Sequence, residues 1–337
     1  MKVLQYLFYP FLFINTQSFV ISRAAEPKRI LKTFEFYDAM SQLQVPNKIQ
    51  GVAKLIRSEN ILPTLLLNFT GGWLANPSLN YLIHYKQFIV SAIITLFVMS
   101  YSMIVNDLFD LEVDRINNPG RPLVTEQVGR REAFALSIFI ATATEFLNVR
   151  FMPGPMKPLA RLALFVVTIY TPILKRICFI KNLTCAALIS FALYYSGLAV
   201  NPSILMSKHS LLNIAGQFIF WGSYQNEVLL DILDKDGDEK AGISTVPVLF
   251  GNDVAYTIAN FTIHFNILWN LFYQMSRAYS SQHGFLLMLF CYPLLKRLRQ
   301  IKNSDFNHVA IRQSVNSTVK PMFLTLLYIC FLRSTTK

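Results

Sequence analysis

The sequence contains few charged residues, and acidic residues are the scarcest. Of its 337 residues only 15% are charged while 53% are hydrophobic, and 31 Lys and Arg stand against 19 Asp and Glu. An average soluble domain is about 25% charged, so a water-soluble fold could not bury this much apolar surface. Disordered, collagen-like and coiled-coil chains are excluded by the same composition. The mean hydropathy of +0.39 therefore predicts a polytopic membrane protein.

Cysteine and histidine are also scarce, and neither is arranged as a set of metal ligands. The 4 Cys form no CxxC pair and the 5 His form no HExxH motif. We therefore expect apolar, buried thiols rather than a disulfide framework or a zinc site.

Long apolar stretches recur along the chain. A membrane-spanning helix needs about 20 mainly apolar residues. None of the stretches alternates as a barrel strand does, so helices must satisfy the backbone. The sequence predicts an all-α polytopic membrane protein with about nine transmembrane helices: 60–80, 86–105, 133–151, 157–174, 178–199, 210–230, 252–275, 284–298 and 319–334.

Basic residues gather in the loops on one side of these spans. The N-terminal arm and the loops after the second, fourth, sixth and eighth spans share one side, and these loops contain more basic residues than the loops on the other side, so the positive-inside rule places the N-terminus inside. The net charge of +12 is therefore a one-sided basic rim at the lipid bilayer, and we expect no nucleic-acid partner.

The N-terminus differs from the rest of the chain. Residues 1–23 resemble a targeting or anchor segment, and residues 24–56 are mixed and basic, as in an extramembrane arm. The membrane domain is expected over residues 57–335. The sequence leaves the organelle open among endoplasmic reticulum, mitochondrion and plastid.

Nine of the 19 acidic residues lie in two short windows, each directly after a predicted span. Both windows contain D-x-x-D-x-x-x-D, formed by Asp107, Asp110 and Asp114 in the first and by Asp231, Asp234 and Asp238 in the second. Offsets of 0, 3 and 7 place three side chains on one helical face.

Three like charges on one face repel each other, and a divalent cation would neutralise them. Carboxylate and amide oxygens suit Mg²⁺ or Mn²⁺, and Mg²⁺ completes its shell with water and phosphate. Two facing clusters are thus expected to clamp a diphosphate through bridging metals, helped by neighbouring basic residues: Arg115, Arg121, Lys175 and Lys240. Acidic helix caps in a solvated loop are the simpler interpretation, but the doubled spacing argues against it.

At these residues the chain resembles the UbiA superfamily of intramembrane prenyltransferases. NDLFDLEVDRINNPGRPL (106–123) resembles the family's first motif, and EVLLDILDKDGDEKAGISTVPVLFG (227–251) resembles its second. Arg57 and Asn60 resemble its R-P-x-N, and YTPILK (170–175) with Asn182 resembles its loop between helices 4 and 5.

The resemblance implies a nine-helix bundle with a central cavity open to lipid. It implies metal ligands at Asn106, Asp110, Asp234 and Asp238, with catalytic Asp107, Asp114 and Asp231 close by. Asn60, Arg121, Tyr170 and Lys175 would face the diphosphate. The second motif is most similar to the digeranylgeranylglyceryl phosphate synthase-like branch. However, Asn226 and Leu230 replace that branch's Arg and Lys, which argues against its glycerol phosphate lipid acceptor.

The implied activity is Mg²⁺-dependent transfer of a prenyl group from an allylic isoprenyl diphosphate to a lipophilic acceptor, namely a quinone precursor, a tetrapyrrole or a lipid. A terpene cyclase of the same superfamily remains open, because an internal alkene can also capture the allylic cation. An ion-coupled transporter is the alternative of another class. It would place its acids in mid-span, whereas these clusters follow the ends of spans.

Overall fold

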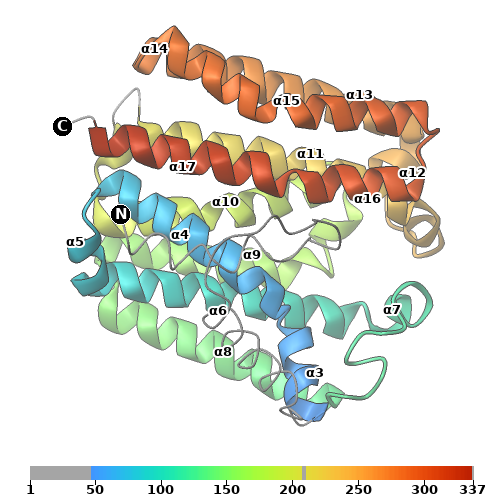
Figure 1. Ribbon diagram of the computed structural model, residues 1–337. Helices are drawn as coiled ribbons and strands as arrows, with labels where there is room; N and C mark the ends of the chain where they lie inside the picture. Colours follow the sequence, from blue (N-terminus) through green and yellow to red (C-terminus); the bar gives the residue numbers. More distant parts are fainter. Residues whose placement is uncertain (1–46, 207–209, 336–337) are drawn as a thin grey trace, which may run out of the picture. The chain divides into compact units, whose positions relative to one another are not determined.

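The computed structural model describes residues 47–206 and 210–335, and every regular element in this part of the chain is helical (Figure 1). The all-α prediction is confirmed. The proposed targeting segment and residues 24–46 of the arm lie outside the described residues. The longer helices are α3 (Asn47–Leu55), α4 (Ile61–Ala75), α5 (Leu79–His84), α6 (Lys86–Phe109), α7 (Leu111–Asn117), α8 (Arg130–Phe151), α9 (Lys157–Tyr170), α10 (Ile180–Val200), α11 (Leu211–Lys240), α12 (Val246–Phe250), α13 (Asn252–Phe265), the π-helix η6 (Asn266–Gln274), α14 (Met275–Ala278), α15 (Ser281–Asn303), α16 (His308–Ser317) and α17 (Val319–Thr335).

Each predicted span overlaps a helix, although several bounds differ. Helix α4 ends at Ala75, before the predicted end of the first span at residue 80, and α11 continues ten residues beyond the predicted end of the sixth span at residue 230. The seventh span is built from α13, η6 and α14 in succession, and the last is preceded by α16 where the sequence suggested a loop. Among the described residues, four helical segments are long and apolar enough to cross a membrane by length and composition alone: Lys86–Phe109, Arg130–Phe151, Ile180–Val200 and His308–Thr335, the last formed by α16 and α17 together.

Helix α10 is the central element of the bundle, packing against α4, α6, α9 and α11. Its contact with α4 is so close because glycines face each other there. A Cβ added to Gly71 would lie 2.0 Å from the carbonyl oxygen of Leu193, and one added to Gly197 would lie 3.1 Å from the carbonyl oxygen of Gly71. Only a residue without a side chain allows the two backbones to touch in this way.

The end of the expected arm packs onto the bundle as helix α3. Leu55 is fully buried in a small apolar cluster with Ile104, Val128 and Ala133. This packing brings the residues that follow α3, including Arg57 and the short helix η2 (Ser58–Asn60), to the end of α6.

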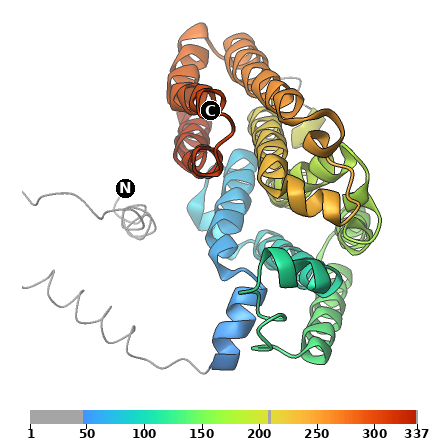
Figure 2. The ribbon, with the colours of Figure 1, turned by 90° about the vertical axis from the view of Figure 1, so that its right-hand side faces the viewer.

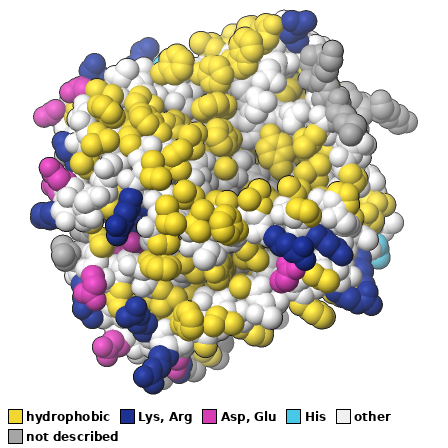
Figure 3. Space-filling model, turned by 180° about the vertical axis from the view of Figure 1, so that it is seen from behind, with side chains coloured by type: hydrophobic (Ala, Val, Ile, Leu, Met, Phe, Trp, Pro, Cys, Tyr) yellow, Lys and Arg dark blue, Asp and Glu magenta, His cyan; other side chains and the backbone are white. Residues whose placement is uncertain are grey.

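Apolar side chains cover much of the molecular surface. Figure 3 shows a broad hydrophobic area on one face, with the charged side chains mostly toward its edges. The exposed large apolar side chains of the described residues include Phe134, Phe139 and Phe146 of α8 and Phe165 of α9. An exposed apolar area of this kind suits a lipid environment and not water.

Helices α7 and α12 lie at one end of the bundle, the end that faces the viewer in Figure 2. Helix α11 ends there in a Schellman motif. The N–H of Ile243 donates to the carbonyl oxygen of Asp238 (2.8 Å), the N–H of Gly242 donates to that of Glu239 (3.1 Å), and Gly242 has the required positive φ of 65°. This cap stops α11 directly after its acidic turns.

Substituting Gly71 with Ala should destabilise the bundle, because the added Cβ collides with a backbone oxygen that cannot rotate away. We expect a cost of about 1–3 kcal/mol, as for other overpacked sites, measured by thermal unfolding in detergent. Gly154→Ala is the control, since its Cβ would meet nothing within 4 Å. Equal unfolding midpoints for the two variants would contradict the close contact between α4 and α10.

Candidate active site

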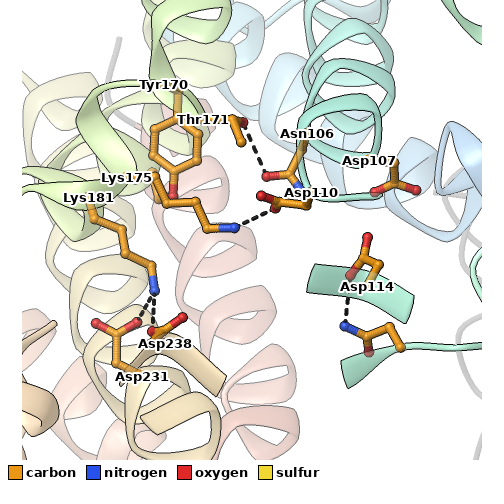
Figure 4. A network of polar contacts seen from close by, with 12 residues as sticks. Asn106, Asp107, Asp110, Asp114, Tyr170, Thr171, Lys175, Lys181, Asp231 and Asp238 are labelled. Atoms are coloured by element: carbon orange, nitrogen blue, oxygen red, sulfur yellow. Dashed lines mark hydrogen bonds and ion pairs between the residues drawn. The ribbon is translucent and has the colours of Figure 1, made fainter. Parts of the chain in front are cut away.

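Both acidic clusters lie at the helix ends that face the segment between α9 and α10. The first cluster is at the end of α6 and in α7, and the second is in the last turns of α11. Lys175, in the short helix η4 (Leu174–Arg176), and Lys181, in the first turn of α10, reach into them (Figure 4).

The first triad does not lie on one continuous helical face, contrary to the sequence-based expectation. Helix α6 ends at Phe109, and Asp110 leaves helical geometry (φ −89°, ψ 7°) before α7 begins. The N–H groups of Asp110 and Asp114 still bond to the carbonyl oxygens four residues earlier (2.9 and 2.7 Å), so the chain bends rather than unwinds. Two features account for the bend. Asp has a low helix propensity, and Asp107 and Asp110 pair with cations that lie on different elements.

Positive charges surround the first triad. Arg57 Nη2 donates to Asp107 Oδ1 at 3.2 Å, and the Asp107 side chain is fully buried. Arg121 lies near enough for its charge to stabilise the carboxylates of Asp107 and Asp114. Asp114 also accepts a hydrogen bond from Asn118 Nδ2 at 3.1 Å. Burial nevertheless raises the pKa of the Asp114 carboxyl above its ordinary value.

The segment after α9 contributes the contacts to Asn106 and Asp110. Lys175 Nζ forms an ion pair with Asp110 Oδ2, and Thr171 Oγ1 donates to Asn106 Oδ1 at 3.4 Å. The charge of Lys175 also stabilises the carboxylates of Asp234 and Asp238 in the second cluster. Lys175 thus pairs with the first cluster, and its charge also acts on the second.

The second triad lies on one helix, as its spacing predicts. Lys181 Nζ donates to Asp231 Oδ1 at 2.6 Å and to Asp238 Oδ2 at 3.2 Å, which shows that these two carboxylates share a face of α11. Asn182 Nδ2 donates to the other oxygen of Asp231 at 2.8 Å. Asp234, one turn before Asp238, is exposed.

Electrostatics in this triad disfavour full ionisation. Desolvation by the surrounding protein and, after it, the like charge of Asp238 raise the pKa of the Asp234 carboxyl. Burial raises the pKa of Asp238 as well, although Lys181 opposes the shift. The second cluster therefore has a deficit of positive charge.

Three other predicted residues are not drawn into these contacts. Arg115 pairs with Glu112 at 2.7 Å on the surface, where 59% of its side chain is exposed. Lys240 is exposed at the last position of α11. Asn60 lies in η2, and its backbone carbonyl oxygen accepts a hydrogen bond from Thr64 Oγ1.

A second polar group lies deeper in the bundle, and the sequence analysis assigned a role to only one of its members, Tyr170. Cys185 Sγ donates to the Tyr170 hydroxyl at 3.0 Å and is hydrogen-bonded to the Glu227 side chain. Tyr170 thus contacts this group and not a carboxylate of the triads. Glu227 precedes Asp231 by four residues, and this helical spacing was the signal available in the sequence.

The residues of the two clusters fit a magnesium ion by their chemistry. Their donors are carboxylate and amide oxygens, which Mg²⁺ prefers. Among the residues that the structure describes, no group of three His, Cys, Asp or Glu side chains surrounds a single point. Mg²⁺ commonly takes one or two carboxylates and keeps several waters, so this arrangement suits it. The ammonium groups of Lys175 and Lys181 pair with these carboxylates and offset part of their negative charge.

A protein-family model covers most of the chain. The UbiA prenyltransferase family model matches residues 62–327. The chain belongs to the UbiA prenyltransferase family. It is a multi-pass membrane prenyltransferase, and both acidic clusters lie inside the matched region.

Individual relatives support the assignment. The digeranylgeranylglyceryl phosphate synthase of Haloquadratum walsbyi is 26% identical over 215 residues, which are 64% of this chain and 72% of that protein. A solved digeranylgeranylglyceryl phosphate synthase structure shares the fold, with a TM-score of 0.64 and 20% identity over 84% of this chain and 98% of that one. A UbiA homologue from Archaeoglobus fulgidus bound to DMAPP and Mg²⁺ also shares it, with a TM-score of 0.58 and 17% identity over 85% and 99% of the two chains.

Substituting Asp231 with Leu should strongly destabilise the metal-free protein, because buried Lys181 would retain only its longer contact with Asp238. Breaking a buried pair from one side costs about 3–5 kcal/mol. Unfolding in detergent without divalent ions measures the effect, and Asp236→Leu, at an exposed position of the same helix, is the control. A midpoint for Asp231→Leu equal to that of the control would show that the Lys181 contacts add nothing to stability.

Proposed function

We propose that this UbiA-family enzyme transfers a prenyl group from an allylic isoprenyl diphosphate to a lipophilic acceptor within the membrane, and that it requires Mg²⁺. The observation that carries the proposal is the position of Lys175. It pairs with Asp110 and acts electrostatically on Asp234 and Asp238. An anionic group with bound cations fits between carboxylates arranged in this way. We assign the activity to residues 57–335.

The metal ligands are Asn106 and Asp110 on the first cluster and Asp234 and Asp238 on the second. Mg²⁺, with Mn²⁺ as a substitute, neutralises the charge of a diphosphate leaving group when it is bound. The Archaeoglobus fulgidus homologue bound to DMAPP and Mg²⁺ supports this choice of ion and substrate class.

Basic and polar side chains hold the diphosphate beside these ligands. Lys175 is central, and Arg121 is the second contact, because its Nε is buried and has no hydrogen-bond partner within the described residues. Asn60, Arg115, Tyr170 and Lys240 complete the predicted set. The catalytic carboxylates Asp107, Asp114 and Asp231 lie beside this site, where Asp107 pairs with Arg57 and Asp231 pairs with Lys181.

The chemistry requires a dry site next to a charged one. As the bond between the allylic carbon and the diphosphate oxygen breaks, its electron pair leaves with the diphosphate, where Lys175 and Arg121 stabilise the charge. The apolar bundle keeps water from the resulting cation. An oxygen or aromatic carbon of the acceptor then captures the cation and releases a proton.

The acceptor is a lipophilic quinone precursor, tetrapyrrole or lipid. The digeranylgeranylglyceryl phosphate synthase relatives favour a lipid. Against a phosphate-bearing lipid stands Asn226, which occupies the position of that branch's Arg and hydrogen-bonds to Thr318 Oγ1 at 3.0 Å. An uncharged amide of this kind gives an anionic headgroup no counter-charge.

One assay separates transferase from cyclase. Purified protein in detergent receives Mg²⁺ and farnesyl or geranylgeranyl diphosphate, first without and then with a glycerol phosphate lipid or a phenolic acceptor. We expect diphosphate release that depends on the acceptor. Release with a hydrocarbon product and no acceptor would identify a cyclase. No release with any chain length or acceptor would refute the proposed activity.

Asp110→Ala and Asp234→Ala should each lower turnover by a factor of about 10²–10³, the effect of removing one electrostatic group from a transition state. Asp236→Ala, exposed on the same helix as Asp234, should retain activity. Product formation under saturating Mg²⁺ measures the effect, with thermal unfolding as the check of folding. A folded Asp110→Ala or Asp234→Ala enzyme with full activity would disprove its assignment as a metal ligand.

A further inference from the structure

Lys181 is the side chain whose position the proposed reaction does not explain. It lies in the first turn of α10, where the helix dipole is positive and a cation is disfavoured. The residue is only 8% exposed, and its ammonium group bridges Asp231 Oδ1 (2.6 Å) and Asp238 Oδ2 (3.2 Å). A lysine is stable in this place because two carboxylates offset the cost of burying its charge.

The two carboxylates are not equivalent partners. Asp231 is 1% exposed, and its second oxygen is occupied by Asn182 Nδ2 at 2.8 Å. Asp238 is 7% exposed, makes the longer contact with Lys181, and lies one turn from exposed Asp234. Asp231 is therefore the permanent anchor of Lys181, while Asp238 is the partner that can be exchanged.

We propose that Lys181 is a resident counter-cation of the second acidic cluster, which competes with a divalent ion for Asp238 and thereby sets the metal affinity of the cluster. This inference rests on the proposed function, in which Asp234 and Asp238 hold the metal. While Lys181 contacts Asp238, its charge repels a divalent cation at Asp234 and Asp238 and keeps one oxygen of Asp238 occupied.

The consequence concerns the order of binding. A site with its own ammonium group holds a divalent ion more weakly than its carboxylates alone would, because the two cations repel each other until an anion arrives. The diphosphate provides that compensation, so in this enzyme metal and prenyl diphosphate bind as a strongly coupled pair. By linkage, the factor by which the diphosphate tightens metal binding equals the factor by which metal tightens diphosphate binding.

The test is to remove the charge of Lys181 and keep its hydrogen bonding. In Lys181→Gln the amide still donates to Asp231, so the variant retains a partner for the buried carboxylate. Loss of a positive charge a few ångströms from the metal should tighten Mn²⁺ binding about tenfold without diphosphate. It should also reduce the factor by which a non-hydrolysable farnesyl diphosphate analogue tightens Mn²⁺ binding. Lys181→Met is the second variant and carries the same expectation.

The measurement is Mn²⁺ titration of the purified full-length protein in detergent, with free Mn²⁺ read by electron paramagnetic resonance. Lys296→Gln, which removes the same charge at an exposed position of α15, is the matched control and should bind Mn²⁺ as the wild type does. A side chain with only a structural role would leave Mn²⁺ affinity unchanged or weaken it. Either result in folded Lys181→Gln would overturn the inference.

A different result would count against the proposed function instead. If the wild-type protein binds no Mn²⁺ at millimolar concentrations, with or without the diphosphate analogue, then the acidic clusters are not a metal site. If the wild type binds Mn²⁺ and Lys181→Gln binds it no more tightly, the metal site stands and only the role of Lys181 falls.

Discussion

Buried carboxylates at one end of an apolar bundle are tolerable only with nearby positive charge, and much of the local structure satisfies this requirement. An unpaired carboxylate in such surroundings costs several kcal/mol. Asp107 is paired with Arg57, Asp110 with Lys175, and Asp231 and Asp238 with Lys181. Each cation comes from a different element than its acid. The ion pairs therefore fasten the segment after α3, helix η4 and the start of α10 to the ends of α6 and α11.

This arrangement depends in turn on the packing of α10. The first turn of α10 carries Lys181 and Asn182, and the rest of the helix packs against α4, α6, α9 and α11. Glycine at positions 71 and 197 lets α4 approach α10 to backbone contact. A wider separation would move the Lys181 ammonium relative to the face of α11. The position of the charged side chains at the end of the bundle therefore depends on the glycines in its core.

Much of this could be predicted from the sequence because helices have a simple periodicity. Apolar length located the spans, and spacing alone placed Asp231 and Asp238 on one face of α11. The bend at Asp110 could not be predicted from the sequence. The backbone hydrogen bonds continue across it, so no helix-breaking residue marks it. The cations that hold Asp107 and Asp110 are also distant in sequence. Arg115 pairs with Glu112 three residues earlier, a contact that helical spacing allows, whereas the entry of Lys181 into the second cluster joins residues fifty positions apart and could not be predicted from spacing.

Helix α11 shows how one element combines a charged end with an apolar interior. Asp238, Asp234, Asp231 and Glu227 follow one another from its C-terminal end inward, and the twenty residues from Leu211 to Leu230 contain no other acid than Glu227. Cationic partners become fewer along the same path. Lys175 and Lys181 face the outer acids, whereas Glu227 hydrogen-bonds to the thiol of Cys185. A substrate with an anionic head and a long apolar tail matches this gradient from end to end. The reacting bond would lie where the two environments meet, near the level of Asp231.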